Sequence, residues 1–381
     1  MSHGPRIAQA GLPAASQEWR ASFLLLTAGG LLLVSLLLAE VAVRLFSSVY
    51  MTPAILKQQS VAYEPALFAR TVFPQAEATV QGAGVSYFIN RNGYRGATFA
   101  FDKPPGTTRI AVYGGSATFD LLMPEGKDWP HRLETILRSQ GFPATEVINA
   151  GVFGHAAFEC FGRLYAEGHL LSPDYVLLYT AWNDIKLFRS TLPLLRTVKP
   201  YKGNPMIEYQ GSLDRILSET SQLYVRLRQR YFKTRWRFHE EGLVEQGEGA
   251  QPISRAAIQQ FRLTIQAFID LSRNIGAEPI LITEARLATR TASQAQKKRI
   301  GYHMQNMSDE VLYEAYENID TVLRDVAREK AVLLIGASEA LSGRDDYLAD
   351  HVHLTDAGSQ ALAGLVAKHL NPLLTKGTVR E

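Results

Sequence analysis

The sequence has little cysteine, little net charge and no internal repeat. Its single cysteine, Cys160, excludes an intrachain disulfide and a metal site built from several thiolates. The formal charge of +3 is too small to indicate a nucleic-acid partner. No period of 20–50 residues recurs, which argues against a solenoid or a propeller. The 381 residues, 46% hydrophobic and 20% charged, are typical of a globular protein with one large or two ordinary domains.

The one long hydrophobic run lies near the N-terminus. Residues 21–39 contain no charge and are long enough to cross a bilayer as a helix. A signal peptide would have a shorter apolar core and a small-residue cleavage site, and a soluble surface helix would have a polar face. Because the apolar helix continues to Phe46, we expect an uncleaved membrane anchor over residues 21–46, preceded by a tail over residues 1–20.

The orientation of this anchor is not fixed by flanking charge. Arg6 and Arg20 precede the run, and Arg44 and Lys57 follow it, so the count of positive residues is equal on the two sides. A short tail inside, with the large domain outside, is the simpler topology. We therefore expect a single-pass membrane protein whose main domain is periplasmic or extracellular.

The body of the chain alternates short apolar runs with helical patterns. This alternation predicts a parallel sheet of about five strands with helices on both faces. The expected strands are residues 110–113, 146–149, 175–179, 278–283 and 331–335, and the expected helices are residues 129–139, 156–167, 254–275, 308–330 and 356–370, the last stopping before Pro372.

This pattern also suggests domain limits. Residues 47–107 form a linker and a small β-rich approach segment, with a hairpin over residues 78–90 and a basic turn-rich loop over residues 90–96 that is either structural or beside a site. The main domain covers residues 108–372, with residues 117–128 as a loop and an insertion at about 187–253, and residues 373–381 form a C-terminal tail.

Within the insertion, residues 224–238 place six cationic residues among aromatics. Such a run is usually a solvated face. The alternative is contact with anionic lipid headgroups or an acidic glycan.

Chemically useful residues follow four of the expected strands. Because the carboxyl ends of parallel strands share one edge of a sheet, these residues can converge. Ser116 would be a nucleophile, His353 its base, and Asp350 the group that orients His353. The backbone N–H groups of Ser116 and Gly151, with the side-chain amide of Asn183, would stabilise the negative charge that develops on a substrate oxygen.

Each of these residues also has a structural interpretation. Gly151 alone suits close packing, Asn183 alone a helix cap, and Asp350 with His353 an incidental ion pair. His351 is a rival base, although the spacing from Asp350 favours His353. Asp350, His351 and His353 together also suit a metal, but a further ligand cluster is not evident. His155 either lines the pocket or starts a helix.

Taken together, the ordered set resembles the SGNH (GDSL-type) hydrolase superfamily. The matching blocks are Gly114-Gly115-Ser116, Asn149-Ala150-Gly151, Ala181-Trp182-Asn183-Asp184 and Asp350-His351-Val352-His353, within residues 85–370. The resemblance implies a flavodoxin-like three-layer α/β/α fold and ester hydrolysis without a metal or organic cofactor. Two positions depart from the family pattern: Gly115 replaces the usual aspartate, and Ala181 a frequent glycine.

Three functions follow from this resemblance and the anchor. The first is a membrane-anchored serine esterase that removes acyl groups from a cell-envelope glycan or a smaller acylated substrate. The second is an O-acyltransferase, or its partner, working beside a membrane acyl-donor protein. The third is a non-catalytic scaffold, which an intact Ser116, Asn183, Asp350 and His353 disfavour.

Overall fold

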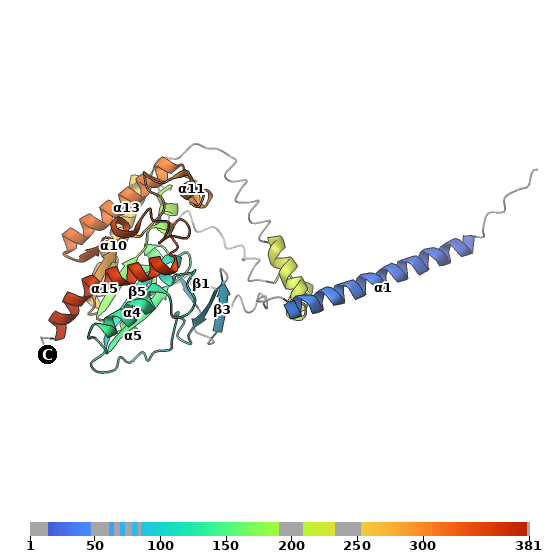
Figure 1. Cartoon of the computed structure of the whole chain (residues 1–381), viewed down its shortest axis with the longest axis horizontal. Helices are drawn as coiled ribbons and strands as arrows, with labels where there is room; N and C mark the ends of the chain where they lie inside the picture. Colours follow the sequence, from blue (N-terminus) through green and yellow to red (C-terminus); the bar gives the residue numbers. More distant parts are fainter. Residues whose placement is uncertain are drawn as a thin grey trace, which may run out of the picture. The chain divides into compact units, whose positions relative to one another are not determined.

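The computed structural model describes residues 14–46, 61–64, 69–72, 78–82, 85–189, 209–232, 253–305 and 307–378 (Figure 1). The chain divides into two compact units. One comprises Met1–Ala54 and Pro205–Arg235, and the other Ile55–Asn204 and Trp236–Glu381. Part of the expected insertion thus groups with the expected anchor. Residues 83–84 of the expected hairpin and residues 233–238 of the basic run lie outside the described residues.

The second unit is built on a five-stranded parallel sheet. Its strands are β5 (Thr108–Gly114), β6 (Thr145–Gly151), β7 (Tyr175–Tyr179), β8 (Glu278–Ile282) and β9 (Leu333–Ile335). They lie in the order β6-β5-β7-β8-β9. In chain order this is 2-1-3-4-5, the doubly wound arrangement of flavodoxin-like folds. The expected fold class is confirmed, and the strand order reverses between β5 and β7.

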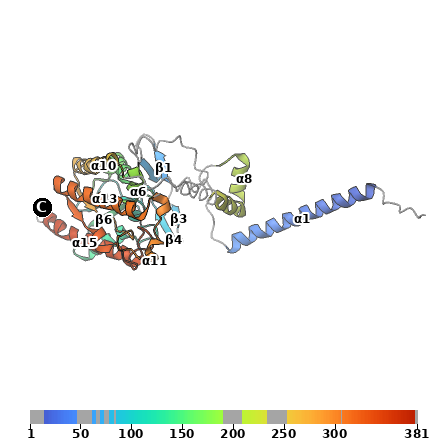
Figure 2. The same cartoon turned by 90° about the horizontal axis from the view of Figure 1, so that it is seen from above.

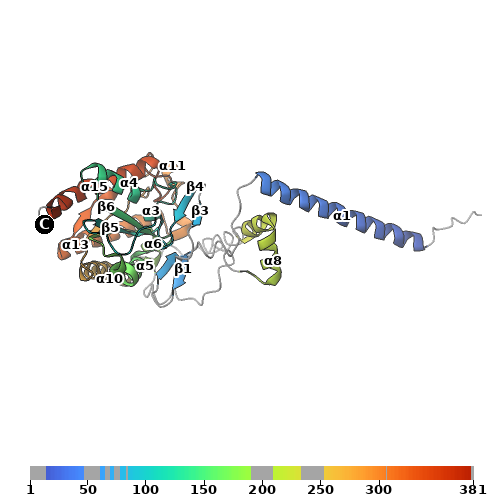
Figure 3. The same ribbon diagram turned by 90° about the horizontal axis from the view of Figure 1, so that it is seen from below.

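Helices cover both faces of this sheet. The long ones are α4 (Trp129–Ser139), α5 (Ala157–Leu171), α10 (Arg255–Asn274), α13 (Asp309–Lys330) and α15 (Asp356–Thr378). α4 packs against α15, and α10 packs against both α5 and α13. Figure 3 shows α4 and α15 on one side of the sheet and α5 and α10 on the other. The sheet is almost fully buried between these layers, which fixes the positions of its strand ends.

Local sequence explains where these helices start. The Asp128 side chain accepts the N–H of His131 at the start of α4, where Pro130 suits the first turn. Ser254 and Ser308 cap α10 and α13 in the same manner.

Shorter elements complete the described part of the chain. Two antiparallel hairpins pair β1 (Val61–Glu64) with β2 (Ala69–Val72) and β3 (Ala78–Gly82) with β4 (Val85–Ile89). The short helices are α3 (Ser116–Phe119), α6 (Trp182–Ile185), the 3-10 helix η1 (Lys186–Arg189), α11 (Gln294–Lys297), α12 (Tyr302–Gln305) and α14 (Ala337–Leu341).

Several expected boundaries are wrong. The closing helix does not stop before Pro372 but continues to Thr378, so residues 373–378 are not a tail. Proline removes one helical hydrogen bond, yet Leu374 beyond it is buried in the core, and this packing holds the last turns. The fifth strand starts at Leu333 because Ala331 takes a left-handed conformation at the end of α13. Residues 117–128 continue helix α3 before they become a loop.

The first unit contains the apolar helix α1 (Ala14–Phe46) and α8 (Ser212–Thr220), followed by helical residues 222–232 (Figure 2). By length and composition, residues Ser22–Phe46 are sufficient to cross a membrane, and none of that stretch is buried in the described protein.

Candidate active site

Ser116, His353 and Asp350 form a continuous hydrogen-bonded chain. Ser116 begins α3 directly after β5, and its Oγ lies 2.8 Å from Nε2 of His353. Nδ1 of His353 lies 2.7 Å from Oδ2 of Asp350. The sequence separation between Ser116 and His353 is 237 residues, so the fold alone brings them together. A hydroxyl, an imidazole and a carboxylate in this order can generate a nucleophile and stabilise the resulting imidazolium.

The Asp350 carboxylate is fixed by its own loop. Its Oδ1 accepts the backbone N–H groups of Val352 at 3.0 Å and of His353 at 2.9 Å. A bridge between Leu348 and Leu354 closes the base of this loop. Burial opposes the negative charge, but the hydrogen bond and charge of His353, with the nearby His351, hold the pKa of Asp350 well below its usual range. Asp350 is therefore ionised at neutral pH.

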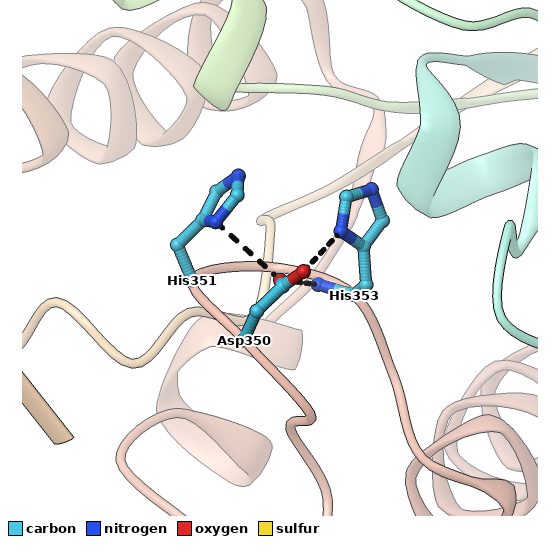
Figure 4. Close-up of side chains that lie close together, drawn as sticks. All are labelled: Asp350, His351 and His353. Carbon is cyan, nitrogen blue, oxygen red and sulfur yellow. Dashed lines mark hydrogen bonds and ion pairs between the residues drawn. The ribbon is translucent and has the colours of Figure 1, made fainter. Parts of the chain in front are cut away.

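His351 occupies a different position from His353. Its Nδ1 lies 3.5 Å from Oδ1 of Asp350, and its ring stacks on Trp182 with the ring centroids 4.0 Å apart. Figure 4 shows the Asp350 carboxylate facing both imidazole rings. Of the two histidines, His353 is the one that contacts Ser116. This is the histidine that the spacing from Asp350 favours.

Asp350, His351 and His353 also satisfy a simple geometric test for metal ligands, since one donor atom of each lies within 4.8 Å of the others. However, the Asp350 oxygens already accept the His353 ring and two backbone N–H groups. A cation bound there would have to compete with the bond that orients His353. The geometry therefore favours the proton-transfer arrangement.

Asn183 lies across the strand-order reversal from residues 115–124, which contain Ser116 and are called the serine loop below. It belongs to α6, directly after β7, and its Nδ2 donates to the carbonyl of His155 at 2.9 Å. An amide nitrogen carries two hydrogens, so a second donor remains on Nδ2. A Cβ built at Gly115 would lie 2.6 Å from this nitrogen. Gly115 thus leaves room for the Asn183 amide in its present position.

Gly151 does not present its N–H as the sequence analysis expects. This N–H donates to Oδ1 of Asn149 at 3.0 Å. A Cβ at this position would lie 2.3 Å from the backbone nitrogen of Phe119, so Gly151 allows β6 to approach the serine loop closely. Gly154, three residues later, has φ of 77°. Among the described residues, the N–H of Gly154 has no hydrogen-bond partner. A second glycine in the loop after β6 is the sequence feature that could have indicated this backbone donor.

Arg95 supports the residues that follow Ser116. The sequence alone does not show whether the loop over residues 90–96, which contains Arg95, is structural or lies beside a site. The buried guanidinium of Arg95 donates to the carbonyls of Phe119 and Met123 at 2.6 Å each. It also lies 3.4 Å from Asp128, and both side chains are fully buried. The Asp128 carboxylate accepts the Asn149 amide at 2.9 Å. The basic loop over residues 90–96 is therefore a structural support of the serine loop.

Two buried carboxyl groups hold α6. Oε2 of Glu284 accepts the N–H of Trp182 at 2.7 Å, and Asp184 accepts the N–H of Ala157 at 2.9 Å. Burial raises the pKa of Asp184 to about 7 and that of Glu284 to about 8. These bonds fix both Asn183 and the Trp182 ring on which His351 stacks. Buried His155 lies in the loop just before α5, and its carbonyl accepts the Asn183 amide.

The chain is similar to several solved hydrolase structures. A lipase/acylhydrolase from Enterococcus faecalis is 16% identical, with a TM-score of 0.41, over 69% of this chain and 95% of that one. A GDSL-like lipase from Bacteroides thetaiotaomicron is 11% identical, with a TM-score of 0.38, over 70% and 89%. An acetyl xylan esterase is 15% identical, with a TM-score of 0.41, over 69% and 99%.

These structures include the GDSL type that the four sequence blocks resemble. No protein-family model matches this chain, and no curated protein matches it. The TM-scores of all three structures lie below 0.5.

Proposed function

We propose that this chain is a serine ester hydrolase. The observation that carries the proposal is the pair of contacts of His353, 2.8 Å to Ser116 Oγ and 2.7 Å to Asp350. His353 Nε2 takes the hydroxyl proton as Ser116 attacks the ester carbonyl, and ionised Asp350 stabilises the imidazolium. The proton then passes to the alcohol that leaves, and water releases the acyl group by the same steps in reverse order.

The developing oxyanion needs donors that are already in place. We assign this role to the N–H of Ser116 and the second hydrogen of Asn183 Nδ2, with the N–H of Gly154 in place of that of Gly151. The support is that the Gly151 N–H has Asn149 as its partner, whereas those of Ser116 and Gly154 have none among the described residues. Removing one such donor typically lowers turnover about 10²–10³-fold.

The reaction is tested with p-nitrophenyl acetate and the full-length protein in detergent. Wild type should release p-nitrophenol, and Ser116→Ala should reduce the rate to background. Ser139→Ala, at an exposed serine at the end of α4, is the matched control and should keep the wild-type rate. A fluorophosphonate probe should label the wild type and spare Ser116→Ala. Equal rates in wild type and Ser116→Ala would refute the proposal, and so would failure of the probe to label.

We further propose that the substrate is an acylated cell-envelope glycan, because an anchored domain acts on what lies near the membrane. Incubation with an O-acetylated polysaccharide should release acetate in wild type and none in Ser116→Ala. If acetyl groups instead appear on an added glycan acceptor without net acetate release, the enzyme is an O-acyltransferase. That outcome would also justify a search for a membrane acyl-donor protein.

We propose that α1 remains as a membrane anchor with the main domain outside. The support is that Glu40, late in α1, bonds to residues 221–223, so cleavage of a signal peptide after Glu40 would remove contacts within the first unit. The mature protein should keep its full 42.3 kDa and stay in the membrane pellet after alkaline carbonate washing. An alkaline phosphatase fusion at the C-terminus should be active. A shortened, soluble product would rule out the anchor.

A further inference from the structure

Glu40 lies where the uncharged part of α1 ends. Residues 21–39 contain no charge. At 1.5 Å per residue they span about 28 Å, close to the ~30 Å of a bilayer's hydrocarbon core. If this stretch crosses the membrane, Glu40 is at the boundary between hydrocarbon and headgroups. The remaining turns of α1, with Arg44, then lie among the headgroups.

The Glu40 carboxylate caps a second helix. Its Oε1 accepts the N–H of Gln222 at 2.9 Å, and its Oε2 accepts the N–H of Leu223 at 2.9 Å and the hydroxyl of Ser221 at 2.8 Å. These amides belong to the first turn of helical residues 222–232, where backbone N–H groups have no acceptor within the helix itself. A carboxylate is favoured there because the positive end of the helix dipole faces it.

Arg44 reinforces this junction from one turn further along α1. It donates to the carbonyl of Thr220, the last residue of α8, at 2.8 Å and forms an ion pair with Glu40 at 2.6 Å. Thus α8 ends, and the next helix begins, against the same turns of α1. Both helices are therefore held at the depth of Glu40.

These two helices have an unusual distribution of polar and apolar side chains. A buried ion pair joins them: Arg228 donates to both oxygens of Asp214, at 2.7 and 2.9 Å, and both residues are buried. Their exposed positions include four large apolar side chains: Leu213 and Ile216 on α8 are 69% and 57% exposed, and Leu227 and Tyr231 are 57% and 56% exposed. Spacings of three and four residues place each pair on one helix face.

We propose that α8 and helical residues 222–232, together the two-helix segment, lie in the membrane interface beside the anchor. Single exposed apolar residues are ordinary, but here two pairs occur on helices fixed at headgroup depth by Glu40. Arg215, Arg226 and Arg230 outnumber Glu219 outside the buried Asp214–Arg228 pair, which suits anionic headgroups. The segment would bury its Leu, Ile and Tyr side chains at the acyl boundary, as interfacial helices do.

The test uses the full-length protein in vesicles of phosphatidylcholine with phosphatidylglycerol. Ile216→Cys and Leu227→Cys are each labelled with an environment-sensitive nitrobenzoxadiazole dye. The native Cys160 is buried, and unlabelled wild type checks that it does not react. Arg215→Cys, an exposed position on another face of α8, is the matched control. We expect the dyes at 216 and 227 to emit at shorter wavelength and to be quenched several-fold more by shallow spin-labelled lipid than the dye at 215.

Two results would overturn the proposal. Water-like emission at 216 and 227, equal to that at 215, would mean that both faces are in solvent. Short-wavelength emission without lipid quenching would mean that protein, either this chain or a second copy, covers them. Glu40→Gln, checked for retained helix content by circular dichroism, should reduce the lipid quenching at 216. Unchanged quenching in that variant would refute the role given to Glu40.

Discussion

The side chain of Asn183 lies in space that a side chain at residue 115 would enter. A Cβ at Gly115 would lie 2.6 Å from Asn183 Nδ2 and 3.0 Å from the carbonyl of His155, the acceptor that orients this amide. The glycine and the asparagine follow neighbouring strands, β5 and β7, on either side of the reversal in strand order. The two positions are therefore linked by geometry, and a side chain at 115 would shift the Asn183 amide from its present position.

Gly115→Ala should therefore impair activity more than stability. The added methyl displaces the Asn183 amide, so we expect kcat to fall about 10–10³-fold, by the reasoning that applies to a lost oxyanion donor. Hydrolysis of p-nitrophenyl acetate measures this. The control is Gly364→Ala within α15, where no atom lies within 4 Å of an added Cβ. Equal activity in both variants would show that the oxyanion site does not use Asn183.

Replacing the two histidines separately should distinguish their roles. His353→Ala removes the group that contacts Ser116, and we expect the rate to fall by about 10³-fold or more. His351→Phe keeps a ring to stack on Trp182 while removing the nitrogen near Asp350, and should cost about tenfold or less. The measurement is kcat for each variant under the same conditions. A larger loss of kcat in His351→Phe than in His353→Ala would assign the role of the base to His351 instead of His353.

The strands could be predicted because their sequence signal is local. The buried run Tyr175–Tyr179 has the expected bounds, and the N-cap serines Ser254 and Ser308 mark their helices correctly. Placing Ser116, Asn183, Asp350 and His353 after strands required only the rule that parallel strands share one carboxyl edge. Their catalytic roles remain predictions.

The remaining features depend on contacts that the sequence does not display. Nothing in the order of residues 149–151 says that the Asn149 side chain accepts the Gly151 N–H. The helix past Pro372 depends on tertiary burial of Leu374, which outweighs a local propensity. The buried position of Arg95 likewise could not be predicted, because arginine is rarely buried and its partners are carbonyl groups distant in the sequence.

Stability should fall as the pH rises from about 5 to 8, partly because of Glu284. Burial raises the pKa of this group to about 8 in the folded protein, above the ordinary ~4.3 of an unfolded chain. Between these values the folded state binds more protons than the unfolded state, so each increase in pH favours unfolding. Below pH ~4 this contribution is fully present.

Glu284→Gln should reduce this dependence, because a glutamine carbonyl can still accept the Trp182 N–H without ionising. Between pH 5 and 8, we expect the free energy of unfolding of this variant to decrease by about 1–3 kcal/mol less than that of wild type. Chemical denaturation at several pH values, followed by circular dichroism, measures it. Glu317→Gln, at a surface ion pair with Arg290, is the control and should leave the slope near that of wild type. Identical slopes in wild type and Glu284→Gln would contradict the assignment.

Arg95→Leu should be among the more destabilising single changes, although Arg95 lies outside the hydrogen-bonded chain of Ser116, His353 and Asp350. The variant leaves the Asp128 carboxylate buried without its guanidinium and removes donors from the carbonyls that follow Ser116. Breaking a buried pair in this way typically costs about 3–5 kcal/mol. The comparison is Arg290→Leu, which breaks an exposed pair with Glu317 and should cost much less, because water already solvates both charges.

A second change separates charge from packing at Arg95. Adding Asp128→Asn to Arg95→Leu removes a buried charge that has lost its guanidinium and keeps His131 as its ionic partner, so we expect part of the lost unfolding free energy to return. Esterase activity should remain low in the double variant, because the carbonyls of Phe119 and Met123 still lack the guanidinium that holds the serine loop. If activity returned along with stability, the buried charge of Asp128 would be the cause of the lost activity. The hydrogen bonds from Arg95 to this loop would then not be needed to position Ser116.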